Sequence, residues 1–230
     1  MLYKIFSKVL DNRLKKILPK IITKHQLAFT KDRLIFDNIL VAFETLHCLQ
    51  KNNSKTHGFM VLKLDMSKAY DRVEWTFLEE IMPKMGFNDR WINLMMVCVK
   101  LVTYSILVNG ELCGMIQPTR GIRQGDPLSP FLFLLCTEGL NGLIKKSDME
   151  GDIHGFSLCK RGPKLTYLLF TDDCLQFCRA TMEECSKVLE ILNMYEGSMG
   201  QKVNRSRTAI FSSKFTSAEM RSSIKGALGV

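Results

Sequence analysis

The sequence predicts an α+β fold in which an antiparallel sheet has helices packed on one face. Short apolar runs at Phe59–Asp65, Leu168–Phe177 and Arg207–Ser212 have the length and composition of strands. Helices, a hairpin and another helix separate them, an order that fits an antiparallel sheet with helices on one side. With 46% hydrophobic residues, the 230 residues are enough for one sizeable core or two closely packed subdomains.

Two helices are predicted at the N-terminus. Apolar residues keep helical spacing over Met1–Leu18, and we expect this helix to stop at Pro19. The same basic, amphipathic segment resembles an organellar presequence, but we favour a folded helix. Asp32 is expected to cap a second helix that runs from Arg33 to about Leu49 and is followed by a polar loop.

The middle of the chain predicts two helices, a hairpin and a loop. One helix is expected to end at a left-handed cap on Gly86, and Asn88 is expected to begin the next. Asn109-Gly110 lies between apolar runs, which predicts a β-hairpin. The loop Gly121–Pro130 then opens an apolar helix to about Lys146. Its junction with that helix offers backbone N–H groups and a positive dipole end to phosphates, and a purely structural turn is an alternative of similar weight.

Two capping boxes predict helices in the C-terminal part. Thr181–Glu184 begins a helix that runs to about Gly197, and Thr216–Glu219 begins a last helix. We find no internal repeat, low-complexity tract or linker in the sequence.

Charge and cysteine content narrow the possible partners and compartments. The chain carries 32 Lys and Arg against 23 Asp and Glu, a net charge of +9, which suits a polyanion such as nucleic acid but equally a merely basic surface. Its 8 cysteines are scattered without a Cys-x-x-Cys pair, so we expect buried reduced thiols in an intracellular protein, nuclear or cytoplasmic, and no zinc site. No apolar run approaches the roughly 20 residues of a membrane span.

Two adjacent acids, Asp172 and Asp173, join the apolar runs of the central hairpin. Side chains alternate along a strand, so both acids serve one site only if they lie on the bend of the hairpin. Their repulsion calls for a cation, and Mg²⁺ takes oxygen ligands from carboxylates and phosphates. An isolated acid pair on a turn is more often a solvated loop. Asp65, at the end of another strand, supplies a third carboxylate, and neighbouring strands would bring Asp65 and Asp172 to the same pair of ions.

Three motifs in this order resemble those of a known family, the reverse transcriptase domain of LINE-type, non-LTR retrotransposons that are abundant in plants. The motifs are Leu64–Asp71, Gly121–Pro130 and Phe170–Asp173. Further residues resemble the fingers segment of the family and the motif after its palm hairpin: Gln26, Ala28, Phe29, Arg33, Asp37 and Asn38, and Gly200–Asn204 with Arg207. The resemblance covers nearly the whole chain.

The resemblance implies a right-hand polymerase fold with a palm and partial fingers. Residues 1–58 would be the partial fingers, and residues 59–230 a palm-centred domain with a fingers insertion and no thumb. We expect the chain to be a fragment of a mobile element, without the thumb and endonuclease regions of the parent element.

The resemblance also implies roles for individual residues. Asp65, Asp172 and Asp173 would hold two Mg²⁺ ions, with Mn²⁺ as a possible substitute. Tyr70 would lie under the incoming sugar and exclude a ribose 2′-hydroxyl, and its alternative role is that of an ordinary core tyrosine. Substrate-binding roles would fall to Arg33, Arg123, Gln124, Gly125 and Arg207. The partners implied are an RNA template, a DNA primer and deoxynucleoside triphosphates.

Three residues depart from the family pattern. Thr171 replaces the usual Ala before the acid pair, Asp32 replaces a Gly and brings negative charge towards Arg33, and Arg207 replaces a Lys. Arginine keeps the charge but is a much poorer proton donor to a leaving pyrophosphate.

Two functions therefore remain open for the sequence. One is an RNA-directed DNA polymerase domain, and the other is an inactive relic that folds and binds nucleic acid. A metal-dependent phosphohydrolase is disfavoured because it explains neither Tyr70 nor the loop Gly121–Pro130.

Overall fold

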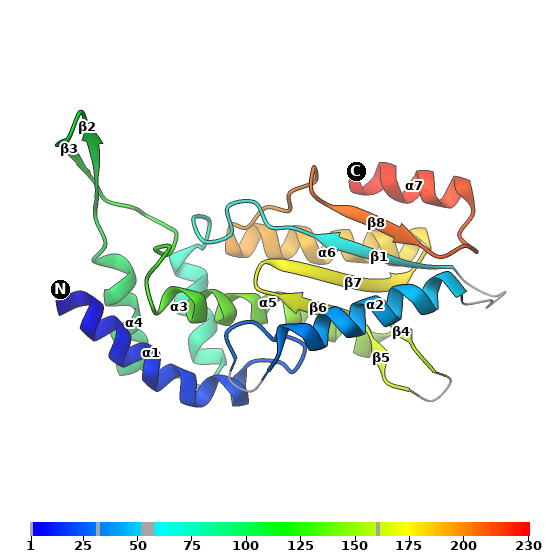
Figure 1. Ribbon diagram of the computed structural model, residues 1–230, viewed down its shortest axis with the longest axis horizontal. Coiled ribbons are helices and arrows are strands. Elements are labelled where there is room, and N and C mark those ends of the chain that lie inside the picture. The colour runs from blue at the N-terminus through cyan, green and yellow to red at the C-terminus, as the bar shows by residue number, and fades with distance from the viewer. Residues whose placement is uncertain (1, 31–32, 52–57, 160–161) are drawn as a thin grey trace.

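The computed structural model describes residues 2–30, 33–51, 58–159 and 162–230 (Figure 1). Its helices are α1 (Leu2–Ile21), α2 (Ile35–Lys51), α3 (Trp75–Lys84), α4 (Asp89–Lys100), α5 (Ser129–Glu150), α6 (Met182–Met199) and α7 (Ala218–Leu228). Its strands are β1 (Phe59–Leu64), β2 (Tyr104–Val108), β3 (Glu111–Ile116), β4 (Phe156–Ser157), β5 (Lys164–Leu165), β6 (Tyr167–Phe170), β7 (Asp173–Arg179) and β8 (Ala209–Ser212). This composition confirms the predicted α+β class.

A four-stranded sheet with the order β6-β7-β1-β8 forms the centre of the molecule, and all its neighbouring strands are antiparallel. In the β1–β7 pair, Leu64 lies opposite Cys174. The C-terminal end of β1 therefore lies beside the start of β7, and the residues that follow β1 come close to the β6–β7 turn. This register brings the segment after Leu64 to the acid pair.

The main core lies between one face of the sheet and the helices α5 and α6. Met60, Leu62 and Leu64 point from β1 into this core, where they meet the apolar run Phe131–Cys136 of α5. Burial of so many large apolar side chains is the dominant favourable term in folding.

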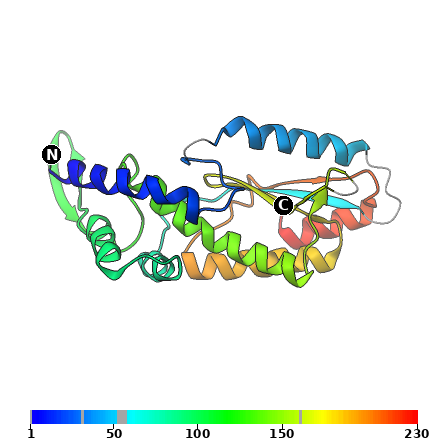
Figure 2. The ribbon, with the colours of Figure 1, turned by 90° about the horizontal axis from the view of Figure 1, so that it is seen from below.

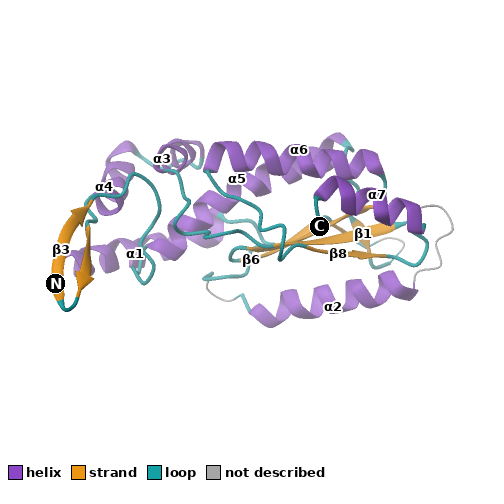
Figure 3. Cartoon of the chain, turned by 90° about the horizontal axis from the view of Figure 1, so that it is seen from above, coloured by secondary structure: helices purple, strands orange, loops and turns teal. Residues whose placement is uncertain are grey.

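Helix α2 covers the opposite face of the sheet, whereas the sequence predicted helices on one face only. Figures 2 and 3 show α2 on one side of the strands and α5, α6 and α7 on the other. The reason is that β1 and β7 carry apolar side chains on both faces, so the second face must also be shielded from water. The resulting small core consists of Leu49, Val61, Phe156, Leu168 and Phe177.

Several predicted element boundaries shift in the structure. Helix α1 continues through Pro19, because a proline there removes one backbone hydrogen bond of the last turn without ending the helix. Helix α2 begins at Ile35, after the predicted start at Arg33, and its predicted cap Asp32 lies outside the described residues. The last helix is capped by Ser217, whose side chain accepts a hydrogen bond from the N–H of Met220. This helix therefore begins one residue later than the capping box at Thr216 predicted.

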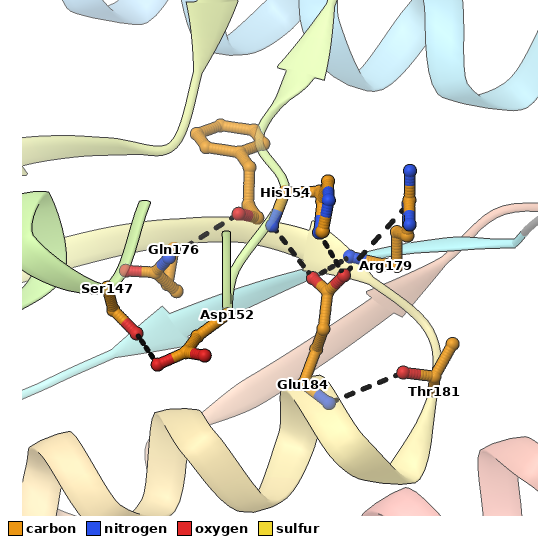
Figure 4. A network of polar contacts seen from close by, with 8 residues as sticks. Ser147, Asp152, His154, Gln176, Arg179, Thr181 and Glu184 are labelled. Atoms are coloured by element: carbon orange, nitrogen blue, oxygen red, sulfur yellow. Dashed lines mark hydrogen bonds and ion pairs between the residues drawn. The ribbon is translucent and has the colours of Figure 1, made fainter. Parts of the chain in front are cut away.

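The predicted cap Thr181 is confirmed, but the acid of its capping box has other partners. Thr181 Oγ1 accepts from the N–H of Glu184. The buried Glu184 carboxylate accepts from the backbone N–H groups of His154 and Arg179 at 3.0 and 2.9 Å, and His154 Nδ1 lies 2.8 Å away (Figure 4). Glu184 thereby ties the end of β7 and the approach to β4 to the start of α6. The short strands β4 and β5 were not predicted, since two residues carry no periodicity.

The β2–β3 hairpin projects from the body of the molecule (Figure 1). Its turn has positive φ at Asn109 and Gly110, as the Asn-Gly signal predicts. Every residue of both strands is exposed, including Leu112 and Met115 at 73% and 76%. Within the described part of the chain, nothing covers either face of this hairpin. None of the described helices combines the length and apolarity that a membrane crossing requires.

We expect Gly121→Ala to destabilise the fold by about 2 kcal/mol. Gly121 has a φ of +86°, and an added Cβ would lie 2.9 Å from the carbonyl oxygen of Asp71. The matched control is Gly142→Ala, on the exposed surface of α5 where a Cβ meets open space, and this change should stabilise by about 0.5–1 kcal/mol. Denaturant unfolding of both variants measures the difference. Equal stability of the two variants would contradict the backbone argument.

Candidate active site

The acid pair lies on a tight hairpin between β6 and β7. Phe170 pairs with Asp173, so Thr171 and Asp172 form a two-residue turn. Thr171 has a φ of +54°, a conformation that is uncommon for a β-branched residue and that indicates strain at the tip. Asp172 therefore lies on the bend, as predicted, whereas Asp173 is the first residue of β7.

Asp65 and Asp172 line one open cavity of about 710 Å³. Asp65 follows β1, Asp172 lies on the turn, and the β1–β7 register brings the two segments together. Other predicted site residues line the same cavity, namely Tyr70, Gln124, Gly125 and Arg207. The structure thus gathers most of the predicted site from segments that lie far apart in the sequence.

The two carboxylates and their neighbour Asp173 repel one another. Burial, and then the charges of Asp173 and Asp65, raise the pKa of Asp172 above its ordinary value of 3.8. A carboxyl group whose pKa rises on folding makes the folded state less stable at neutral pH. A bound cation would remove this repulsion, which is the behaviour expected of a metal-binding carboxylate.

We expect Asp172→Asn to raise the melting temperature at pH 7. The pKa of Asp172 is raised in the folded state, so its charged form destabilises the fold. This loss of stability is fully present above the folded-state pKa, and it disappears below the ordinary carboxyl pKa, where the group is protonated in both states. The gain in melting temperature should therefore shrink as the pH falls towards 4. Melting curves of the variant and the parent chain from about pH 4 to 8 test this. A gain in melting temperature that does not change with pH would show that the charge of Asp172 is not its cause.

Asp173 faces away from the cavity that holds Asp65 and Asp172. Its Oδ1 lies 3.7 Å from Nζ of Lys63 and, although buried, has no hydrogen-bond partner in the described structure. Accordingly, no group of three or more His, Cys, Asp or Glu side chains converges at metal-binding distance among the described residues. Asp65 and Asp172 supply carboxylate oxygens of the kind that a hard divalent cation takes, and Asp173 would have to turn away from Lys63 to join them.

Tyr70 forms a flat wall of the cavity. Its ring stacks on the buried Phe133 with centroids 5.1 Å apart and an interplanar angle of 11°. Burial, and then the charge of Asp172, raise the pKa of its hydroxyl group. Tyr70 therefore packs on the core with one part of its ring and lines the cavity with another, and its role towards the incoming sugar stays a prediction.

The loop Gly121–Pro130 contributes several residues to the lining of the cavity. Gly125 has a φ of +81° and open space where a Cβ would lie, so a ligand can approach its backbone closely. Asp126 is buried and accepts from Ser7 Oγ at 2.6 Å and from the N–H of Leu128 at 2.9 Å. These bonds fix the turn that opens α5, and the offer of its N–H groups to phosphates stays a prediction.

The segment Gly200–Asn204 holds the residues around Asp65 in place. The N–H of Asn204 donates to the carbonyl of Asp65 at 2.8 Å, and the N–H of Ser67 donates to the carbonyl of Lys202 at 2.8 Å. The buried Gln201 donates through Nε2 to the carbonyl of Ala69 at 2.6 Å. Arg207, a few residues after this segment, also lines the cavity.

Two predicted substrate-binding residues lie outside this cavity. The guanidinium group of Arg33 donates to the carbonyls of Thr23 and Gln26, both at 2.5 Å, and so braces the loop after α1. Arg123 lines a separate small cavity beside Tyr3.

Two lysines that line the cavity were not among the predicted site residues, Lys8 from α1 and Lys68. Lys68 lies within the first motif. Its backbone is left-handed, with a φ of +51°, and the sequence does not predict this conformation for a lysine. Lys8 comes from a helix distant in sequence and has no local signal.

Comparison with known proteins gives one family and several relatives. The model of the family "Reverse transcriptase (RNA-dependent DNA polymerase)" matches residues 1–221. The chain is 46% identical over 67 residues to an uncharacterized mitochondrial protein of Arabidopsis thaliana, covering 29% of this chain and 55% of that protein. It is 24% identical over 207 residues to an uncharacterized 149 kDa protein of transposon TX1 of Xenopus laevis, covering 90% of this chain and 15% of that protein.

Retrotransposon polyproteins and solved structures agree with this result. The Pol polyprotein of the R2 element of Popillia japonica is 28% identical over 56% of this chain and 20% of its own length. The chain therefore spans only a part of each of these relatives. Among solved structures, apo telomerase of Candida tropicalis superposes with a TM-score of 0.61 and 16% identity, over 92% of this chain and 37% of that chain. At this level of identity, the likeness shows the polymerase fold.

Proposed function

Because the chain belongs to the reverse transcriptase family, we propose that it is the RNA-directed DNA polymerase domain of a non-LTR retrotransposon. Its substrates would be an RNA template, a DNA primer and deoxynucleoside triphosphates. The observation that carries this proposal is the shared cavity of Asp65, Asp172 and Tyr70. A phosphohydrolase is disfavoured because it explains neither Tyr70 nor the loop Gly121–Pro130.

Asp65 and Asp172 would hold the metal ions, and Asp173 would join them after leaving Lys63. Two Mg²⁺ ions, or Mn²⁺ in their place, would supply Lewis-acid activation of the primer hydroxyl and neutralise charge on the triphosphate. Tyr70 would exclude a ribose 2′-hydroxyl by contact. Gly125 and Gln124 would let the backbone approach the nascent base pair, and Arg207 would attract phosphate into the cavity. Arg33 and Arg123 stay predictions from the family resemblance alone.

The proposed division of the chain is partial fingers at residues 1–58 and a palm-centred domain at residues 59–230. The two parts meet at the catalytic hairpin. Gln26 forms a parallel bridge with Leu169 of β6, and Asn38 Nδ2 donates to the carbonyl of Leu169 at 2.9 Å. The fingers segment would therefore support the strand that carries the acids.

The test is primer extension by the purified protein on an RNA template with Mg²⁺ and deoxynucleotides. We expect templated products that disappear without template. An inactive relic is the second candidate, favoured by the orientation of Asp173 towards Lys63. A protein that binds a primer–template duplex but does not extend the primer would be the inactive relic. A folded protein that neither binds the duplex nor extends the primer would contradict both candidates.

We expect the affinity for a primer–template duplex to fall steeply with salt. The chain carries a net charge of +9, and contacts to phosphates release counterions. The dissociation constant should rise at least about tenfold between about 50 and about 200 mM salt. A duplex of scrambled sequence is the control and should bind equally well. An affinity that does not change with ionic strength would contradict binding through phosphate contacts.

A further inference from the structure

Strand β6 is an edge strand of the central sheet, and the turn that follows it carries Asp172. On its inner side β6 pairs with β7, where Leu169 lies opposite Cys174. In an antiparallel pair, residues alternate between positions whose N–H and C=O groups face the partner strand and positions whose groups face away. Leu169 is in a position of the second kind, because its backbone groups bond to residues outside the sheet. The place of Asp172 therefore depends on what closes the free edge of β6 just before the turn.

Loop 22–26, which follows α1, and the side chain of Asn38 close this free edge. The N–H of Leu169 donates to the carbonyl of His25 at 3.2 Å, and Asn38 Nδ2 donates to the carbonyl of Leu169 at 2.9 Å. The parallel bridge between Gln26 and Leu169 adds the loop to β6 as a short extra strand. Leu169 is buried, and a buried backbone group without a partner costs free energy. The edge of β6 is thus fixed only while loop 22–26 keeps its place.

Arg33 and Glu138 hold loop 22–26 by its backbone. The guanidinium group of Arg33 donates to the carbonyls of Thr23 and Gln26, both at 2.5 Å. Glu138 Oε1, on α5, accepts from the N–H of Thr23 at 3.1 Å. Burial raises the pKa of Glu138, and the hydrogen bond from Thr23 and the charge of Arg33 partly offset this rise. The positive charge of Arg33 is therefore matched inside the protein, by backbone carbonyls and a half-buried carboxylate.

We propose that Arg33 and Asn38 are positioning residues, which fix Asp172 through loop 22–26 and β6. This role replaces the phosphate contact that the family resemblance implies for Arg33. Arg33 is not among the described residues that line the cavity of Asp65 and Asp172, and its donors are directed at carbonyl groups. Asn38 has no charge and shares only the positioning role. The consequence for catalysis rests on the proposed function.

Amide hydrogen exchange tests this role without any activity. The N–H of Leu169 should exchange at least about tenfold faster in Arg33→Ala and in Asn38→Ala, because each change loosens the edge of β6. The N–H of Leu62, in the central strand β1, should change by less than about twofold. Lys24→Ala is the matched control, since it removes one positive charge from the same loop at an exposed position and should leave Leu169 unchanged.

Two results of the exchange experiment would overturn the proposal. One is an unchanged rate at Leu169 in both variants, and the other is an equal acceleration at Leu62, which would report a general loss of stability. Asn38→Ala shortens a single half-buried side chain, so it keeps the test decisive if Arg33→Ala does not fold.

If the protein extends primers, steady-state kinetics distinguish positioning from phosphate binding. Loss of a positioning residue should lower kcat by about ten- to a hundredfold and change the KM for nucleotide by less than about twofold. The neutral change Asn38→Ala should have the same effect as Arg33→Ala. Loss of a phosphate contact would instead raise KM, and Arg33→Lys, which keeps the charge, would largely restore it. A raised KM in Arg33→Ala together with unchanged kinetics in Asn38→Ala would contradict the positioning role.

The double variant Arg33→Ala/Asn38→Ala tests whether the two residues act by one route. Because both act on the contact between loop 22–26 and β6, the second substitution should add little to the loss of kcat and to the faster exchange of Leu169. Effects that simply add would contradict a shared route. If neither the parent nor the variants extend primers, the proposed function fails, and the exchange rates still decide whether Arg33 and Asn38 hold β6.

Discussion

Asp65→Ala and Asp172→Ala are each expected to lower primer extension by at least about a thousandfold, because each removes a carboxylate that the two-ion arrangement needs. The two residues come from different strands and meet in one cavity, so neither substitutes for the other. Extension is measured by product length over time on an RNA template. Asp89→Ala, on the exposed start of α4, is a matched control that should keep full activity.

Both variants should keep their fold. The backbone of Asp65 stays anchored by the N–H of Asn204, and removal of the charge of Asp172 relieves repulsion. Their melting temperatures should therefore equal or exceed that of the parent chain. If either variant extends primers at the parent rate while folded, the metal-site assignment is wrong.

Tyr70→Ala is expected to have the second largest effect, a loss of discrimination against ribonucleotides. The ring of Tyr70 forms a wall of the cavity and is fixed in place by its stack on Phe133. Removal of the wall should raise ribonucleotide incorporation at least about tenfold relative to deoxynucleotide incorporation, since the ring blocks one substrate more than it binds the other. The measurement compares the incorporation efficiency of the two nucleotide types.

Two further variants separate the steric role of Tyr70 from its packing role. Tyr70→Phe keeps the ring and should keep discrimination, whereas Tyr70→Val should behave like the alanine variant. Loss of the stack on Phe133 should also lower stability, by about 1–3 kcal/mol, because part of the ring is buried. A lowered melting temperature with an unchanged nucleotide ratio would make Tyr70 a core residue only.

The meeting of Asp65 and Asp172 could be predicted from the sequence because it depends on strand ends. Each acid terminates an apolar run, and neighbouring strands in a sheet bring such ends together. The direction of Asp173 could not be predicted. It depends on the register that places Lys63 of β1 on the same face as the start of β7, and no local pattern encodes that register.

Long-range packing explains the other differences between prediction and structure. Lys8 enters the cavity because α1 packs beside the start of α5, where Ser7 bonds Asp126. Arg33 matched the fingers segment of the family, but its guanidinium group is held by the carbonyls of the loop after α1. Sequence patterns report which faces are apolar, and they do not report which distant backbone groups a side chain will reach.

The small core under α2 implies that the helices on the two faces of the sheet exchange their amide hydrogens at different rates. Opening of α2 exposes only the cluster around Val61 and Phe177, whereas opening of α5 or α6 disrupts the main core. Amides of α2 should therefore exchange through a sub-global opening of lower free energy than global unfolding. While α2 is open, the face of β6 and β7 that it covers contacts water. The β6–β7 hairpin thus borders a cooperative unit that opens and closes independently of the main core.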